Sequence, residues 1–321
     1  MFWQADTDTG VRHEALFYAD VDELLAGALP YAEAGLDAGE SVLVALPPPS
    51  RKPMEAALAS APREQLRFLE MERVGRNPAR LIPAYREFVE AAAGEGRRAR
   101  GIGEQLWAGR SRAELEECER HEALLNLAFG GVPEWSLLCP YNTTNLSDEI
   151  LDRVARHHPY LREGAEVAES SPYVGHPAPG QVFAGALEVF AETPAELPFG
   201  AAGLAQVRRV VAEFGAAVAL SPRRIQDVVL AANELATNSI RHGGGSGLLR
   251  IWRDEGALVC EVRDEGRFTD PLVGRVRPDP NQPGQRGLWI VNQTCDLVQI
   301  RSAEGGSVVR LRAGEAITGV S

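Results

Sequence analysis

The chain lacks the paired cysteines on which disulfide frameworks and zinc knuckles depend. Its cysteines are Cys118, Cys139, Cys260 and Cys295, and no two form a C-x-x-C pair. Widely spaced cysteines of this kind are typical of buried thiols in a reducing compartment. The cysteine pattern therefore excludes a disulfide framework and a zinc knuckle.

An excess of basic residues, a long hydrophobic run and a basic N-terminal leader are also missing. The 45 acidic residues outnumber the 33 basic ones, and the net charge of -12 would repel a phosphate backbone. No apolar run approaches the ~20 residues of a membrane span, and Asp6 and Asp8 stand where a signal peptide needs lysine or arginine. We expect a cytoplasmic protein that binds a protein or small ligand, and neither nucleic acid nor membrane directly.

A length of 321 residues with 45% hydrophobic content is enough for two domains of about 150 residues each. In the N-terminal half, short apolar strands alternate with amphipathic helices. The expected helices cover residues 21–38, 53–61, 78–93, 111–129 and 147–157, and the expected strands cover residues 41–46, 66–69 and 100–104. Ser111 and Glu114 form a capping box at the start of the longest helix. This alternation predicts a mostly parallel α/β sheet covered on both faces.

The pattern changes after a Glu-, Ser-, Pro- and Gly-rich segment that we interpret as a linker. We expect a first domain over residues 1–162, the linker over 163–182, a second domain over 183–315 and a tail over 316–321. The second domain should have strands at residues 184–197, 248–252, 258–262, 297–302 and 307–312 and helices at 204–219, 222–241 and 286–294. Residues 267–283 hold four prolines and no periodicity, which predicts a mobile lid. The expected architecture is an α+β sandwich with helices on one face of a mixed sheet.

A polar stripe follows one face of the helix predicted over residues 222–241. Glu234, Asn238 and His242 recur at intervals of four and therefore project to the same side. A solvated helix face would produce the same pattern, and His242 is more typical of a structural hydrogen-bonding residue than of a base. The stripe alone does not decide between a site and a surface.

Three glycine-containing segments follow the stripe. Asp264 and Gly266 end a strand, where a fixed carboxylate meets a turning backbone. Gly284 and Gly287 stand at the start of a helix, whose free N–H groups attract phosphate. The run G-G-S, ending in Ser307, begins the last strand. Each segment is common by itself, but their order is not.

The order E-L-A-T-N-S-I-R-H, D-E-G, G-Q-R-G-L and G-G-S resembles the N, G1, G2 and G3 boxes of the Bergerat (GHKL) ATP-binding fold. It is most similar to the RsbW-like anti-sigma-factor serine kinases. Two positions depart from the family pattern: Gln285 replaces the first glycine of the G2 box, and Ser307 replaces the usual threonine.

The resemblance implies ATP and Mg²⁺ as cofactors and a role for each box. Asn238 would ligate the Mg²⁺, Asp264 would accept a hydrogen bond from the adenine amino group, and Glu234 would be the catalytic base. The remaining implied nucleotide-binding residues are Gly266, Arg286, Gly287, Leu288 and Ser307. Arg286 is open to two interpretations, a contact to the γ-phosphate or a surface arginine.

Several N-terminal segments, including G-I-G-E-Q-L-W-A-G-R and H-E-A-L-L-N, resemble the MEDS sensory domain that is attached to RsbA-type anti-sigma factors. The resemblance implies a sensor of an unknown small ligand on a RecA-like scaffold. No G-x-x-x-x-G-K-[ST] loop is present, so we expect no nucleotide hydrolysis in this half. We place His13, Glu104, Trp107 and His121 around the sensory pocket. A metal site is an alternative for the histidines and the glutamate, although satisfied core histidines are more common.

Together, the resemblances predict an anti-sigma regulatory protein that senses a ligand, sequesters a sigma factor and phosphorylates a serine or threonine of a STAS-domain anti-anti-sigma partner. A homodimer is also expected. Two alternatives stay open: an ATP-binding switch without kinase activity, and a two-component sensor histidine kinase. The second lacks its usual dimerising histidine hairpin in this sequence.

Overall fold

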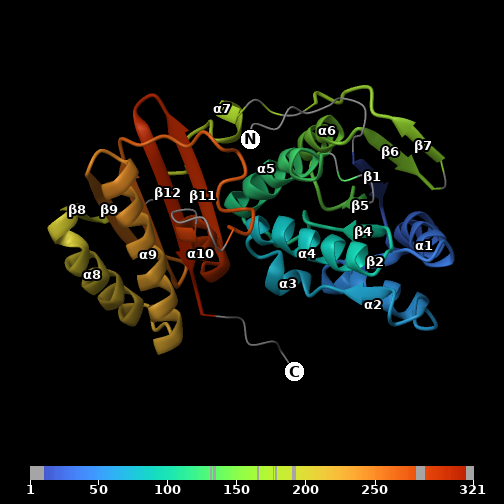
Figure 1. Cartoon of the computed structure of the whole chain (residues 1–321), viewed down its shortest axis with the longest axis horizontal. Coiled ribbons are helices and arrows are strands. Elements are labelled where there is room, and N and C mark those ends of the chain that lie inside the picture. The colour runs from blue at the N-terminus through green and yellow to red at the C-terminus, as the bar shows by residue number, and fades with distance from the viewer. Residues whose placement is uncertain are drawn as a thin grey trace. The chain divides into compact units, whose positions relative to one another are not determined.

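The computed structural model describes residues 11–130, 132, 135–164, 166–175, 177, 179–189, 193–279 and 286–315. The chain divides after Pro177 into two compact units (Figure 1). Within the described residues, no helix combines the length and apolar character that a membrane crossing requires.

The first unit is built on a seven-stranded sheet in the order β3-β2-β4-β5-β1-β6-β7. The strands are β1 Arg12–Tyr18, β2 Ser41–Ala45, β3 Leu66–Phe68, β4 Ala99–Gly103, β5 Trp135–Asn142, β6 Tyr160–Glu163 and β7 Glu166–Glu169. All neighbouring strands run parallel except the β6–β7 pair. The predicted mostly parallel sheet is confirmed, and the RecA-like relationship stays a prediction.

Helices cover both faces of this sheet. They are α1 Val21–Asp37, α2 Pro48–Ala57, α3 Met71–Val74, α4 Leu81–Gly94, α5 Arg112–Phe129 and α6 Asp148–His157, with a 3-10 turn at Pro78–Arg80. Leu16 of β1 and Leu138 of β5 pack with α1 on one face. On the other face, Trp135 contacts Tyr85 of α4 and Phe129 of α5.

The ends of these helices follow local sequence rules. The capping box of α5 is confirmed, since Ser111 and Glu114 exchange both bonds. The helix expected from residue 53 begins instead at Pro48, because proline is tolerated in the first turn, where its missing N–H has no partner to lose. The expected linker also differs: residues 166–169 form strand β7, which pairs with β6 at the edge of the first sheet.

The second unit contains a five-stranded sheet in the order β11-β12-β10-β9-β8. The strands are β8 Ala195–Gly200, β9 Ser246–Asp254, β10 Ala257–Asp264, β11 Leu297–Ala303 and β12 Gly306–Ala313. Every pair is antiparallel, so the expectation of a mixed sheet was wrong. Hairpins connect β9 to β10 and β11 to β12, and short hairpins can join only antiparallel strands. The strand expected over residues 184–197 is confined, among the described residues, to β8.

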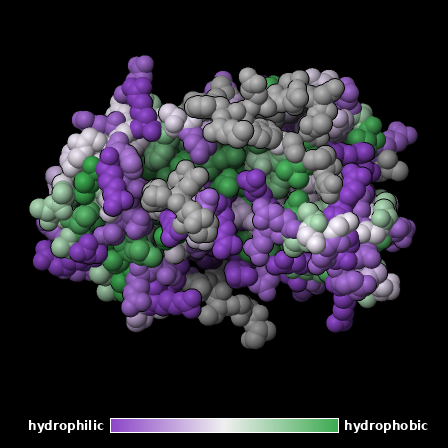
Figure 2. Space-filling view, in the orientation of Figure 1, coloured by the Kyte–Doolittle hydropathy of each residue, from purple (hydrophilic) through white to green (hydrophobic). Residues whose placement is uncertain are grey.

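One face of this sheet carries α8 Leu204–Ala217, α9 Pro222–His242 and α10 Arg286–Thr294 (Figure 1). A short helix, α7 Pro179–Val182, and a 3-10 turn, Ala201–Gly203, precede them. Val211 of α8, Val228 of α9 and Val291 of α10 pack on Leu258 and Cys260 of the central strand. The arrangement fits an ATPase-type sandwich. Figure 2 shows hydrophilic residues over much of the visible surface, with hydrophobic residues in smaller groups between them.

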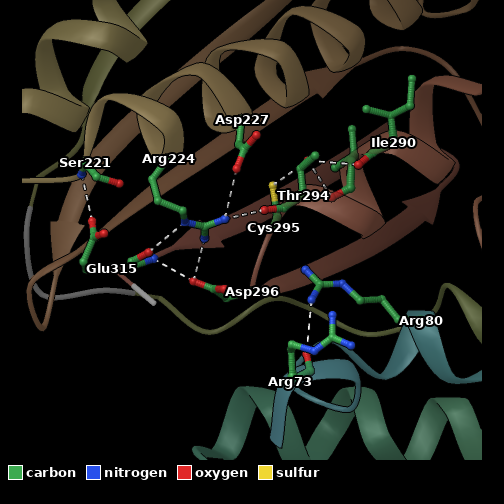
Figure 3. Close-up of polar contacts among 12 residues, drawn as sticks. Arg73, Arg80, Ser221, Arg224, Asp227, Ile290, Thr294, Cys295, Asp296 and Glu315 are labelled. Carbon is green, nitrogen blue, oxygen red and sulfur yellow. Dashed lines mark hydrogen bonds and ion pairs between the residues drawn. The ribbon is translucent and has the colours of Figure 1, made fainter. Parts of the chain in front are cut away.

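A half-buried arginine, Arg224, connects the start of α9 with the end of α10 and the residue after β12. Arg224 donates from Nε to the Gly314 carbonyl at 3.1 Å and from Nη1 to the Thr294 carbonyl at 2.8 Å. Its Nη2 pairs with Asp296 Oδ2 at 3.0 Å (Figure 3). The same carboxylate oxygen accepts the Gly314 N–H at 2.8 Å. These bonds connect α9, α10 and β12, so the helix that carries the polar stripe is fixed at its first turn.

The opposite face of the second sheet contains a cluster of ion pairs around the buried Glu261. Glu261 of β10 accepts two bonds from Arg310, at 2.6 and 2.9 Å, and one from Arg263 at 2.7 Å. Arg310 bonds Oε2 of Glu261, whereas Arg263 bonds Oε1. Arg250 Nη1 also donates to Oε1, at 3.3 Å. Burial raises the pKa of Glu261, but the hydrogen bond from Arg263 and the charge of Arg310 outweigh it and lower that pKa below the ordinary 4.5.

Replacing Glu261 with glutamine should therefore destabilise the second unit in a pH-dependent way. We expect a loss of about 3 kcal/mol in the free energy of unfolding, because three arginines would lose a buried anion. A lowered folded-state pKa contributes stability above pH 4.5 that is lost as the pH falls through the folded value. Urea titrations from neutral to acidic pH measure the difference between variant and wild type, and a difference that does not shrink on acidification would contradict the assignment. Glu255→Gln, at a side chain that is 85% exposed, is the control.

Candidate functional site

The polar stripe of α9 faces the start of α10. Glu234 and Asn238 lie one turn apart on α9, and Gly287 is the second residue of α10. A Cβ atom on Gly287 would lie 3.0 Å from Glu234 Oε2 and 3.1 Å from Asn238 Nδ2. Such contacts are tighter than most real Cβ contacts, so any other residue at position 287 would displace these side chains by a few tenths of an ångström. His242, the third residue of the predicted stripe, is exposed at the end of the helix.

Asp264 lies at the end of β10 and accepts three hydrogen bonds. Ser307 Oγ and the Gly266 N–H both donate to its Oδ1, each at 2.8 Å. Ser239 Oγ donates to Oδ2 at 2.6 Å. Because Asp264 and Ser307 are directly opposite each other in the β10–β12 register, the sheet itself sets one of these contacts.

This carboxylate retains one acceptor position. A carboxylate has about four lone-pair sites, and the three donors occupy two on Oδ1 and one on Oδ2. No hydrogen bond from the described residues uses the remaining site, which is on Oδ2. The group is therefore held rigidly and can still accept one further N–H.

Gly243 and Gly306 make room for Asp264, because neither has a side chain. A Cβ on Gly243 would lie 2.5 Å from Asp264 Cγ, and one on Gly306 would lie 2.1 Å from the Asp264 carbonyl oxygen. Gly306 also has φ of +116°, a conformation that other residues rarely adopt. The predicted residues Gly266 and Ser307 thus belong to one tightly packed loop cluster.

Sequence reasoning missed Ser239 and Gly243. Ser239 directly follows Asn238 and joins the polar stripe to Asp264, since its hydroxyl bonds that carboxylate. The signal was a serine in the interior of a helix, where its hydroxyl needs a partner. Gly243 ends α9, and a glycine after a helix is common enough to attract no attention.

Three predicted residues at the start of α10 differ in their exposure. Arg286 is exposed, and Gly287 is buried against the stripe. Leu288 lies in the hydrophobic core, so only its backbone is available to a ligand. Gly284 and Gln285 lie outside the described residues.

The described part of the predicted lid has no helix or strand, and three hydrogen bonds to other segments are among the contacts that hold it. Arg267 Nη2 donates to the Glu304 carbonyl at 3.0 Å, and the Phe268 N–H donates to Ser302 Oγ at 3.2 Å. Asn292 Nδ2 of α10 donates to the Gly274 carbonyl at 2.9 Å. Its ordering by nucleotide stays a prediction, and residues 280–283 lie outside the described residues.

Two of the four residues predicted for a sensory pocket, Glu104 and His13, lie far apart. Glu104 accepts a bond from Tyr18 at 2.7 Å, whereas His13 lies five residues earlier on the same strand, about 16 Å away along it. Burial raises the pKa of Glu104 to about 7, against the hydrogen bonds from Ser50 and Tyr18. Trp107 stacks under Arg110, whose guanidinium carbon is 3.5 Å from the ring centre.

The two predicted histidines are both buried. His121 lies on α5. His13 lies with Glu122, Cys139 and His158, and one ligand atom from each of the four falls within 4.8 Å of all the others. Of the residues predicted for a sensory or metal site, only His13 belongs to this group.

Comparisons with known proteins match both units separately. Residues 12–159 match the family model described as MEDS, the methanogen/methylotroph DcmR sensory domain, and residues 197–313 match the histidine kinase-like ATPase domain. No curated protein matches the chain. Among solved structures, it is similar to the crystal structure of the RsbU and RsbW domains of Rv1364c from Mycobacterium tuberculosis, with 18% identity and a TM-score of 0.29. That similarity covers 38% of this chain and 32% of the other, about a third of its length.

Gly287→Ala should disrupt the site without unfolding the unit. Its methyl group would meet Glu234 and Asn238, so we expect affinity for MgATP to fall at least tenfold while the melting temperature changes little. Calorimetric titration with MgATP measures the affinity. Gly94→Ala, in the first unit, is the control, because a Cβ at Gly94 meets nothing within 4 Å. Equal affinities for the two variants would contradict the importance of this close approach.

Proposed function

We propose that this chain, which carries a MEDS domain followed by a histidine kinase-like ATPase domain, is an ATP-dependent anti-sigma regulatory protein. It sequesters a sigma factor and transfers the γ-phosphoryl group of ATP to a serine or threonine of a STAS-domain partner. The observation that carries the proposal is the packing of Glu234 and Asn238 against the glycine backbone at the start of α10.

The polar stripe supplies two groups: Asn238 as a ligand for the metal, and Glu234 as the catalytic base. The amide oxygen of Asn238 is an oxygen ligand of the kind that Mg²⁺ accepts, and it adds no charge beside the phosphates. When bound, Mg²⁺ neutralises charge that develops on the phosphates. Glu234, one turn earlier, is placed to orient the attacking hydroxyl and accept its proton. Since phosphoryl transfer depends mainly on positioning, the fixed side chains of α9 suit this role.

Asp264 is the residue assigned to bind the adenine ring of the nucleotide. One lone pair of its Oδ2 is available, and the adenine amino group offers the matching N–H. Gly266, Gly287 and the backbone of Leu288 contribute N–H groups and close approach, while Ser307 positions the carboxylate through its hydroxyl. Arg286 is exposed at the first position of α10, from which it can reach the γ-phosphate.

The regulatory role rests on the order of the sequence boxes and on the sensory unit. The boxes resemble those of anti-sigma serine kinases, whose partners are a sigma factor and a STAS protein. A sensor histidine kinase would need a dimerising helical hairpin before the ATPase domain, and the described residues before β8 form an α/β unit instead. The MEDS domain is assigned to an unidentified small ligand, and the protein is expected to work as a homodimer.

Variants of the two stripe residues should separate catalysis from binding. Glu234→Ala should retain MgATP affinity and lose about 10²- to 10⁴-fold in phosphotransfer rate, because a general base is removed. Asn238→Ala should weaken Mg²⁺-dependent ATP binding itself. Calorimetry and phosphoserine formation on a STAS partner measure the two effects. Unchanged kinase activity in Glu234→Ala would remove the proposed base, and tight ATP binding without phosphotransfer by the wild type would favour a binding-only switch.

Discrimination between bases tests the assignment of Asp264. Inosine triphosphate carries a carbonyl where adenine carries its amino group, so Asp264 would meet an acceptor in place of a donor. We expect the wild type to bind inosine triphosphate at least tenfold more weakly than ATP, a loss of about 1.4 kcal/mol or more. Competition with a fluorescent ATP analogue measures the ratio. Equal affinities for ATP and inosine triphosphate would contradict the assignment of Asp264 to the adenine amino group.

A further inference from the structure

Four buried side chains that the proposed function does not use meet inside the first unit. His13 comes from β1, Glu122 from α5 and Cys139 from β5, and His158 directly follows α6. All four are 0% exposed. One potential ligand atom from each lies within 4.8 Å of all the others.

The hydrogen bond of His158 fixes which of its ring nitrogens carries the proton. His158 Nδ1 lies 2.8 Å from the Val154 carbonyl oxygen, which can only accept. Nδ1 must therefore hold the hydrogen, and in a neutral ring Nε2 keeps a lone pair. This Nε2 lies 3.6 Å from Glu122 Oε2.

His13 is fixed in the same way, through Asn126. The Asn126 Nδ2 group donates to the His157 carbonyl at 2.8 Å, which turns its Oδ1 toward His13 Nδ1 at 3.1 Å. Because an amide oxygen only accepts, His13 Nδ1 carries the hydrogen and Nε2 has the lone pair. That Nε2 lies 3.6 Å from the same Glu122 oxygen and 3.2 Å from Cys139 Sγ.

Acceptors therefore converge on Glu122. Neither of its carboxylate oxygens has a hydrogen bond of normal geometry among the described residues. The Tyr141 hydroxyl can supply only one hydrogen, and it lies 3.3 Å from His158 Nε2. A buried carboxylate facing two imidazole lone pairs is unfavourable unless a cation or a proton lies between them.

The separations between the ligand atoms are close to those around a tetrahedral ion. With metal–nitrogen and metal–oxygen bonds of about 2.0 Å and a metal–sulfur bond of about 2.3 Å, a tetrahedral site puts nitrogen and oxygen ligands about 3.3 Å apart and nitrogen and sulfur ligands about 3.5 Å apart. Two nitrogen–oxygen separations are 3.6 Å, one nitrogen–sulfur separation is 3.2 Å, and all pairs lie within 4.8 Å. The side chains would move closer together to bind the ion.

We propose that His13, Glu122, Cys139 and His158 form a closed zinc site in the core of the first unit. Two imidazoles, one thiolate and one carboxylate are all ligand types that Zn²⁺ accepts. The thiolate and the carboxylate balance the two positive charges of the ion, so the complete site is neutral and suits a dry interior. Zinc binding displaces the thiol proton to solvent and forms the zinc–sulfur bond without any redox change.

All four coordination positions are filled by the protein, which identifies the site as structural. The contacts of Asn126 with His13 and of the Val154 carbonyl with His158 orient the two rings, as outer contacts do in zinc proteins. The ion would thus join β1, β5, α5 and the segment after α6.

The test uses the full-length chain, prepared without a histidine tag and dialysed against metal-free buffer. Elemental analysis should find about one zinc per chain, and Cys139→Ser should lose it. Cys118→Ser is the matched control, because Cys118 is also fully buried on α5 but bonds the Gln105 carbonyl outside the cluster. Asn126→Ala should weaken zinc affinity about 10- to 100-fold by releasing the His13 ring.

Cobalt substitution gives a second measurement that does not depend on a variant folding. Wild-type protein loaded with Co²⁺ should show tetrahedral visible bands and a thiolate-to-cobalt charge-transfer band. Wild-type protein that neither retains zinc nor is stabilised by added Zn²⁺ would overturn the proposal. A cobalt spectrum without the thiolate band, or stoichiometric iron or copper in place of zinc, would also overturn it.

Discussion

The C-terminal site depends on the carboxylate of Asp264, because three separate parts of the unit donate to it. Ser239 reaches it from α9, Ser307 from β12 and the Gly266 N–H from the following loop. Each donor fixes one element relative to the others, and Gly243 provides the space in which the carboxylate lies. The stripe on α9 is held in place from this side by Asp264. From the other end of the helix, the bonds of Arg224 to α10 and β12 do the same.

Environment decides the state of two buried glutamates in this chain. Glu261 is surrounded by three arginines, so its charge is matched and its pKa is lowered despite burial. Glu122 faces two histidine nitrogens and a tyrosine, and burial raises its pKa to about 8, against the hydrogen-bonding effect of Tyr141. The charge of Glu261 is balanced by arginines of its own sheet. Glu122 lacks a positively charged partner among the described residues, and this difference distinguishes the histidine cluster from the ion pairs around Glu261.

Local signals predicted much of the fold and only part of the sites. The capping box at Ser111 and the interval of four between Glu234 and Asn238 are contained in single helices, so their geometry follows from helix periodicity. The bounds of strand β5 were not predicted, because the strand contains Pro140 and proline is normally absent from a central strand. The cluster around Glu122 combines four distant segments, and no spacing rule relates their positions. Only the register of β1 with β5 and the docking of α5 bring them together.

Strand β1 is the first described strand of the chain but lies inside the sheet, between β5 and β6. During synthesis its two neighbours, β5 and β6, are therefore the fifth and sixth of the described strands to leave the ribosome, after nearly the whole first unit has been made. Until then, both hydrogen-bonding edges of β1 lack their native partners, and its apolar residues have no completed core. The nascent chain must keep this strand from pairing with the wrong neighbour while five intervening α-helices emerge. The acidic and basic residues Arg12 and Glu14, placed within the strand itself, oppose such pairing.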